Sequence, residues 1–234
     1  IIHNRGNYAV MNVLAESGKS SVFSGNTTSN INNTDPYGTG YGVFHNSNGT
    51  LTFTAEKGGS IIFDDNIAGR LGGAIHSITN DTVSGGGLTL NGADGSLYSF
   101  TNNTAGAGGA IYTDSPTTID VDVIKFEGNK SEVVENAGNP SVPLGSGGAL
   151  AVGRPQAGTH TGGIVTINAN KAEFINNSAE QNGGAIYNAG TMKLNNAYFK
   201  GNTAGEEGGA IYNAGNMVVT DSVFEDNVTN GHNA

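Results

Sequence analysis

The hydrophobic residues of this chain come in short alternating groups that are separated by glycine or asparagine. Between Ala185 and Phe199 these groups are Ala-Ile-Tyr, Met-Lys-Leu and Ala-Tyr-Phe. Alternation over a few positions, bounded by turn-forming residues, is typical of short β-strands. No stretch keeps the periodicity of a helix over a competing length. The pattern therefore predicts an all-β protein.

The same pattern recurs at a fixed interval towards the end of the chain. Phe174, Phe199 and Phe224 are 25 residues apart, and Ile186 and Ile211 keep the same interval. Repeats of this size indicate a solenoid, in which each unit buries its hydrophobic face against its neighbours. Three strands per repeat predict one rung of a single-stranded parallel β-helix, with rungs about 4.8 Å apart. Like side chains should then form columns inside the coil, with Phe199 on Phe224.

Two polar features repeat together with the hydrophobic ones. A Gly-Gly pair precedes each Ala-Ile, which predicts a corner where the backbone takes a positive φ or passes close to the next rung. Asn177, Asn202 and Asn227 recur where bends are expected. Asparagine tolerates the left-handed region, and its side-chain amide can bond the same amide one rung along. We expect mainly structural roles for these repeated residues.

The repeat predicts one β-helical domain over residues 1–234, with about 25 residues per rung and roughly nine rungs that span about 40 Å. Four loop insertions interrupt it. The insertions near 27–40 and 130–146 follow Phe-x-x-Asn, and those near 76–88 and 153–163 follow Gly-Gly-Ala-[Ile/Leu]. If the turns stack in register, each pair of insertions projects from one edge of the coil. The loops at these edges either bind a partner or are tolerated insertions without a function.

The composition of the chain argues against some kinds of binding partner. The net charge is -10 and charged residues make up 13% of the chain, so no basic stripe is available and a nucleic-acid partner is not expected. No apolar run is long enough to cross a bilayer, so we expect no direct membrane insertion of this segment. The absence of cysteine excludes disulfides and thiol chemistry without indicating a compartment.

The ends of the chain are abrupt. It starts at Ile1 without an initiator methionine or a signal peptide, and it stops where the next Gly-Gly pair is due. We therefore expect a piece of a longer solenoid, with targeting and anchoring segments outside it.

Phe-x-x-Asn motifs alternate with Gly-Gly-Ala-[Ile/Leu] motifs along the chain. Six of the first and five of the second occur from Phe63 to Asn227, and weaker copies extend back to Phe23. This alternation resembles the repeat of the chlamydial polymorphic membrane proteins and of related autotransporter passenger domains. The resemblance implies a right-handed β-helical passenger, secreted through a C-terminal outer-membrane barrel and displayed as an adhesin. Chlamydial members often contain cysteine, which this chain lacks.

In that family both motifs have been linked with adhesion, and the resemblance extends this role to the matching residues of this chain. We expect these residues mainly to hold the coil together. They are Phe63, Asn66, Gly72, Gly73, Ala74, Ile75, Phe100, Asn103, Gly108, Gly109, Ala110, Ile111, Phe126, Asn129, Gly147, Gly148, Ala149, Leu150, Phe174, Asn177, Gly183, Gly184, Ala185, Ile186, Phe199, Asn202, Gly208, Gly209, Ala210, Ile211, Phe224 and Asn227.

Parallel β-helices also include polysaccharide lyases and glycoside hydrolases, which need clustered carboxylates. The tight acidic pairs are Asp64-Asp65 and Asp120-x-Asp122. Asp120 and Asp122 would share one face of a strand, which suits calcium or acid–base work, but alternation with Ile119 and Val121 is simpler to interpret as a half-buried strand. The histidines, at positions 3, 45, 76, 160 and 232, show no metal-binding spacing. We expect most of them at the surface or in turns.

These observations favour a non-enzymatic bacterial cell-surface adhesin and stalk, without catalytic residues, cofactor or metal ion. Its expected location is extracellular, at the outer-membrane surface, and its expected partner is a receptor or glycan on a host or neighbouring cell. Two alternatives remain. One is a polysaccharide-processing enzyme with a cleft under the loops at 130–146 and 153–163, and the other is a filament in which uncapped rungs pair edge to edge.

Overall fold

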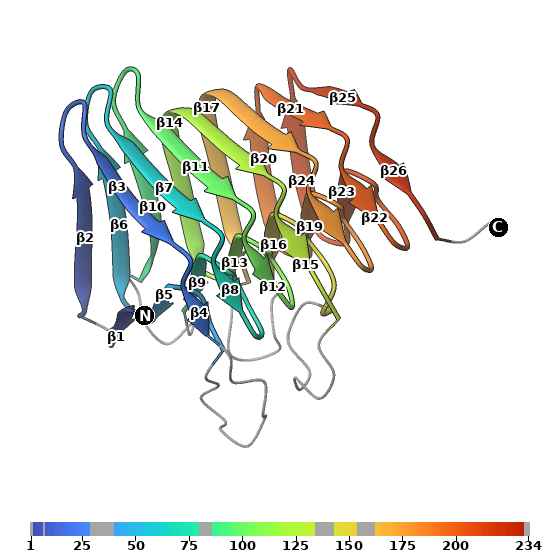
Figure 1. Cartoon of the computed structure of the whole chain (residues 1–234), viewed down its shortest axis with the longest axis horizontal. Coiled ribbons are helices and arrows are strands. Elements are labelled where there is room, and N and C mark those ends of the chain that lie inside the picture. The colour runs from blue at the N-terminus through green and yellow to red at the C-terminus, as the bar shows by residue number, and fades with distance from the viewer. Residues whose placement is uncertain are drawn as a thin grey trace.

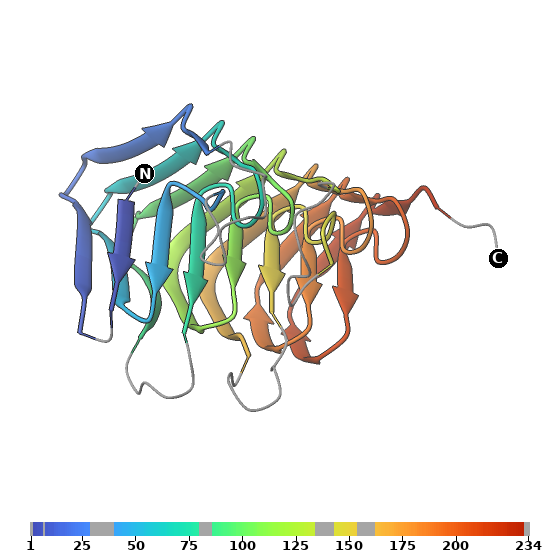
Figure 2. The same cartoon turned by 90° about the horizontal axis from the view of Figure 1, so that it is seen from below.

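The described residues contain β-strands and no helix, and the strands wind into a right-handed parallel β-helix (Figures 1 and 2), as the repeat and the family resemblance predict. The structure, a computed structural model, describes residues 2–6, 8–28, 40–79, 86–133, 143–153 and 162–231. Three sheets run along the coil, and every strand pair within them is parallel. Each turn of the coil contributes in order to the sheets that we call A, B and C.

Sheet A contains the strand that follows each Gly-Gly corner. One face of these strands lines the interior of the coil, and in most of them the residues of both faces are buried. Its strands, in stacking order, are β1 (Ile2–Arg5), β5 (Phe44–Ser47), β9 (Ile75–Ile78), β13 (Ile111–Thr113), β16 (Leu150–Val152), β19 (Ile186–Asn188) and β23 (Ile211–Asn213).

Sheet B has two columns of strands that meet at a bend, which we call the elbow. The first column contains β2 (Val10–Ala15), β6 (Thr50–Ala55), β10 (Gly87–Gly92), β20 (Thr191–Asn195) and β24 (Asn216–Thr220). The second contains β3 (Ser20–Ser24), β7 (Ser60–Asp64), β11 (Leu97–Thr101), β21 (Ala197–Lys200) and β25 (Val223–Glu225). Two long strands, β14 (Pro116–Glu127) and β17 (Ile164–Ile175), run through both columns.

Sheet C follows each Phe-x-x-Asn motif with a strand of only two residues. A pair of residues is too short to carry an alternating pattern, so this fourth strand of each turn was not predicted from the sequence. Its members are β4 (Thr27–Thr28), β8 (Ile67–Ala68), β12 (Thr104–Ala105), β15 (Lys130–Ser131), β18 (Ser178–Ala179), β22 (Thr203–Ala204) and β26 (Val228–Thr229).

The described residues form seven turns of coil, because sheets A and C each contain seven strands. The expectation of roughly nine was too high, because dividing the length of the chain by about 25 residues per rung also counts the inserted residues. Equivalent asparagines on successive turns lie 40, 37, 26, 48 and 25 residues apart. The described strands of every turn thus keep the same path, although the number of residues between turns differs.

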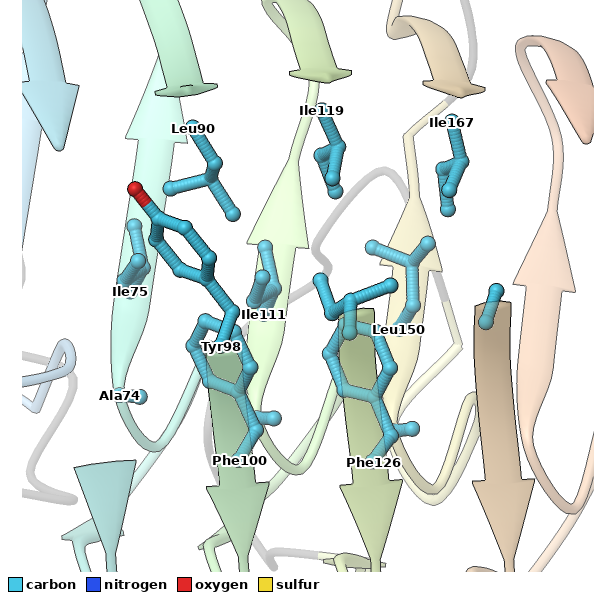
Figure 3. Close-up of a cluster of buried hydrophobic side chains, with 14 of the residues drawn as sticks. Ala74, Ile75, Leu90, Tyr98, Phe100, Ile111, Ile119, Phe126, Leu150 and Ile167 are labelled. Carbon is cyan, nitrogen blue, oxygen red and sulfur yellow. The ribbon is translucent and has the colours of Figure 1, made fainter. Parts of the chain in front are cut away.

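The interior of the coil is one continuous hydrophobic cluster. Ile75, Ile111 and Leu150 enter it from sheet A and face Phe100 and Phe126 of sheet B (Figure 3). All five side chains are fully buried, and each buried side chain of this size contributes roughly 1.5 to 3 kcal/mol relative to exposure.

Candidate functional site

The phenylalanines of the Phe-x-x-Asn motifs form a stacked column along the core. The rings of Phe100 and Phe126 are 5.0 Å apart, those of Phe126 and Phe174 are 4.9 Å apart, and those of Phe199 and Phe224 are 4.7 Å apart. Strand pairing places these residues opposite one another on successive turns. The predicted stacking of Phe199 on Phe224 is confirmed.

The asparagines of the same motifs form a ladder of side-chain hydrogen bonds. Asn129 Nδ2 donates to Asn177 Oδ1 over 3.0 Å, and Asn177 Nδ2 donates to Asn202 Oδ1 over the same distance. The backbone N–H of each asparagine donates to that same oxygen, and Asn177 Nδ2 also donates to the carbonyl of Phe126 one turn back. The predicted bond from amide to amide between rungs is confirmed.

The left-handed backbone conformation lies one residue earlier than predicted. Each motif bends at its third residue, while the asparagine itself turns inward to the ladder. Glycine and short polar side chains tolerate this conformation best. The third residues, all with positive φ, are Gly25, Asp65, Asn102, Gly128, Asn176, Gly201 and Asp226.

The two glycines of each Gly-Gly-Ala motif divide the roles predicted for the pair. The first takes a positive φ, which is 69° at Gly183 and 60° at Gly108. The second passes so close to the adjacent turn that a Cβ on Gly184 would overlap the carbonyl oxygen of Gly209. The same overlap arises between Gly148 and the carbonyl of Gly184. Any side chain at the second position would force successive turns apart.

The motif residues are consequently turned away from solvent. All those from Phe63 to Asn202 are buried. In the last described turns Gly208, Gly209, Ile211 and Asn227 are half-buried, and Phe224 is 50% exposed because no described turn stacks on it. A partner that meets the side of the coil contacts other residues than the motifs themselves.

A shallow hollow lies along the elbow of sheet B. Its volume is about 240 Å³, and it is lined by the turn after β10, the middle of β14 and β17 and the turn after β20. Asp94, Asp120, Asp122, Asn168 and Asn170 supply most of its polar groups. Ile119 and Val121, which alternate with Asp120 and Asp122 along β14, are buried, as expected for a half-buried strand.

Within this hollow, Asp122 is not suited to be the proton donor of a carboxylate acid–base pair. Asn170 Nδ2 and the N–H of Gly95 donate hydrogen bonds to Asp122 and lower the pKa of its carboxyl. Such a catalytic pair needs one carboxyl whose pKa is raised, so that it holds a proton for the leaving group. The pKa of Asp122 is lowered instead, which favours its ionised form.

A comparison with protein families identifies this arrangement of motifs. The Chlamydia polymorphic membrane protein (Chlamydia_PMP) repeat matches residues 60–78, 98–114, 165–189 and 196–214. Each matched segment contains one Phe-x-x-Asn and the Gly-Gly-Ala-Ile that follows it. The chain carries the chlamydial polymorphic membrane protein repeat. Neither the curated proteins nor the solved structures that were compared with the chain contain a match.

The four matched segments account for the alternation of the two motifs. Polymorphic membrane proteins are surface proteins of autotransporter type, and the family implies a location at the bacterial surface or outer membrane. The turn between Phe126 and Leu150 falls outside the matches, because a long insertion separates its two motifs. Its strands still take their places in all three sheets.

The insertions leave the repeats at the two predicted kinds of corner. Those near 27–40 and 130–146 follow β4 and β15 of sheet C, and those near 76–88 and 153–163 follow β9 and β16 of sheet A. The bounds of three of them were set too wide, because Thr27–Thr28, Ile75–Ile78, Gly87–Gly92 and Lys130–Ser131 are strands. Their central segments, 29–39, 80–85, 134–142 and 154–161, lie outside the described residues.

Sequence reasoning missed a row of histidines on the outer face of sheet A. The expectation that most histidines lie at the surface is wrong for His45 and His76, which are buried beside Tyr41. Burial, and after it the charges of His3 and Arg5, lowers the pKa of His45 to about 4. Burial, followed by His45 and Arg70, lowers the pKa of His76 well below its usual value. His160 and His232 lie outside the described residues.

Two kinds of feature are absent from the described residues. No helix in this part of the chain is long and apolar enough to span a membrane. No group of three or more histidine, aspartate or glutamate side chains in the same residues could hold a metal ion.

Proposed function

We propose that this chain is a non-enzymatic, extracellular stalk and adhesin segment of an autotransporter-like surface protein. It binds a receptor or glycan on a host or neighbouring cell. The observation that carries the proposal is the inward direction of the polymorphic membrane protein motifs, which build a continuous core along seven turns of coil. Seven turns correspond to six spacings of about 4.8 Å, or about 29 Å of shaft.

The insertions are the parts of the chain best suited to carry specific recognition. Loops on a rigid scaffold bind partners more often than the scaffold does. The ends of one insertion are joined by a backbone hydrogen bond, because Gly163 N donates to Gly153 O. We assign partner binding to one of two edges, defined as the sheet C edge (29–39 and 134–142) and the sheet A edge (80–85 and 154–161).

The surface charge also favours a partner other than nucleic acid. Lys125, Lys130, Lys171 and Lys200 each form an ion pair with a glutamate. Paired lysines do not provide the unbroken positive surface that follows a phosphate backbone. Binding would instead depend on many weak contacts, with avidity from display in many copies.

The test is a bead-binding assay with cultured cells that compares two matched double variants. One replaces both segments of the sheet C edge with short Gly-Ser linkers, and the other replaces both segments of the sheet A edge. We expect one variant to lose cell binding by about tenfold or more, and the other to stay within about twofold of the parent. Circular dichroism of both variants checks that the coil is intact.

Three results would contradict the proposal. The first is no cell binding by the parent chain at any bead density. The second is hydrolysis or lyase products from a glycan panel, which would make the protein an enzyme. The third is regular filaments of the purified chain in electron micrographs together with an absence of cell binding, which would make assembly its role.

A further inference from the structure

Three histidines on neighbouring turns lie in one row on the outer face of sheet A. His3 of β1, His45 of β5 and His76 of β9 are opposite one another in the strand register. Their ring centroids are 5.0 Å and 4.8 Å apart. We call these three residues the histidine row. In the later turns the same position is occupied by Tyr112, Ala151, Tyr187 and Tyr212.

The inner members of the histidine row are buried without hydrogen bonds. His76 is 1% exposed and His45 is 9% exposed. Neither ring nitrogen of either residue has a hydrogen-bond partner. The ring of Tyr41 covers both, because it stacks on His76 at 4.1 Å and lies 4.5 Å from His45. A neutral imidazole tolerates this setting, whereas an imidazolium buried without a partner is costly.

The titratable and charged groups around the row do not offset this cost. Arg5 at the end of β1 acts on His45, and Arg70, in the segment before the Gly-Gly corner, acts on His76. Both are cations. The tyrosines that pack on the row are Tyr41 and Tyr112, and Asp114 follows β13 one turn further along. Protonation of the row would place several positive charges on adjacent strands.

We propose that the histidine row is an acid-sensitive latch that keeps the first turns of sheet A closed at neutral pH. In acid the rings take up protons by turning into water. This displaces the segment at Tyr41 and opens β1, β5 and β9. The later turns, which carry Tyr187 and Tyr212 at the same position, stay closed. The device is independent of the adhesin role and divides the coil into an acid-labile and an acid-resistant part.

The direction of the pH dependence follows from the protons bound in each form. The lowered pKa of His45, about 4, means that its ring is neutral in the closed form between pH 6.5 and 4. In the open form the same ring is protonated over that range. The opening equilibrium therefore rises as the pH falls, by up to about tenfold per pH unit for each histidine.

The test is pulsed amide hydrogen exchange, read by mass spectrometry at several pH values between 7.5 and 4.5 and corrected for intrinsic exchange rates. We expect peptides that cover 41–48 and 71–78 to lose protection by about tenfold or more over this range. Peptides that cover 183–190 and 208–215 should change by less than about twofold, because their row contains tyrosine.

A matched variant separates the latch from general acid unfolding. His45→Tyr combined with His76→Tyr places in the early turns the residue that the later turns already carry, and it should remove the extra exchange. His232→Gln removes a histidine remote in sequence and should leave the exchange unchanged. Imidazole proton NMR of the parent chain gives an independent readout in case the double variant misfolds, with two rings expected to stay neutral well below pH 6.

The proposal is overturned if protection is lost at the same pH in early and late turns, or is not lost in either. It is also overturned if both buried rings titrate near pH 6.5 in the closed protein. Persistence of the extra exchange in a folded double variant would exclude the histidine row as its cause.

Discussion

The asparagine of each inner Phe-x-x-Asn motif bonds to the turns on both sides of its own. Asn177 donates to Asn202 and to the carbonyl of Phe126, and it accepts from the side chain and the backbone of Asn129. A short carboxamide is suited to this, because it offers a donor and an acceptor in one plane. All these groups are buried, so the loss of one member leaves several without a partner.

Asn177→Ala is therefore expected to destabilise the coil by roughly 3 to 5 kcal/mol, since it leaves a buried carbonyl and a buried N–H unpaired. Asn227→Ala, at the half-buried end of the ladder, is the matched control and should cost about 1 kcal/mol. Urea unfolding followed by circular dichroism gives both values. If the two variants lose the same free energy of unfolding, the buried hydrogen bonds of the ladder stabilise the coil no more than the half-buried ones at its end.

The second glycine of each corner has a different physical role from the first. At Gly184 an added Cβ would overlap backbone atoms of the next turn, which cannot move aside. We expect Gly184→Ala to yield little folded protein. Gly18→Ala is the control, because Gly18 has a positive φ of 66° but nothing within 4 Å of an added Cβ. Its cost should be about 1 kcal/mol, measured by thermal unfolding of the soluble fraction.

At the scale of elements, the same motif residue has different neighbours in different turns of the coil. Phe126 is sandwiched between Phe100 and Phe174, whereas Phe224 is stacked on Phe199 alone among the described residues and is 50% exposed. The energy of a repeated residue thus depends on its neighbours along the column. In a stacked repeat, stability is close to a sum of units and their interfaces.

Phe126→Ala should accordingly cost roughly 3 to 5 kcal/mol, because it leaves a cavity with stacked rings on both sides. Phe224→Ala should cost about 1 to 2 kcal/mol, since half of that ring is already in contact with water. Equilibrium unfolding of both variants under the same conditions tests the difference. The prediction fails if the two substitutions have equal effects.

At the scale of the whole molecule, the free energy of unfolding should depend on pH because of the buried histidines in the first turns of the coil. The pKa of His45 is lowered to about 4 in the folded chain, so the folded state binds fewer protons than the unfolded state between pH 6.5 and 4. Stability contributed by this group is complete above pH 6.5 and is lost as the pH falls towards 4. His76 changes in the same direction.

The expected loss from His45 alone is up to about 3 kcal/mol across that interval. Urea unfolding at pH 7.5 and at pH 4.5 measures it, and the His45→Tyr and His76→Tyr double variant should show a smaller difference between the two pH values. Ionised carboxylates with lowered pKa values, such as Asp122, also lose stabilisation in acid and act equally on both proteins. An identical pH dependence in parent and variant would contradict the assignment to histidine.

The sequence by itself determined the coil and its inner columns. Exact repetition, as between Phe174, Phe199 and Phe224, predicts which side chains stack, and a Gly-Gly pair before Ala-Ile predicts a tight corner. Both predictions hold, because parallel strands in register align residues that occupy the same place in each repeat. The fold class and the corners that carry the insertions followed from the same regularity.

Only the tertiary structure decided what lies on the outside of the coil. His3, His45 and His76 sit at irregular intervals in the sequence and become neighbours only when the inserted residues loop out and the strands pair. The two-residue strands of sheet C are likewise too short to show an alternating pattern. Residues that face the interior must be hydrophobic, so their positions form a repeating pattern in the sequence. Residues on the outside become neighbours through the strand register, and insertions of different length hide that register in the sequence.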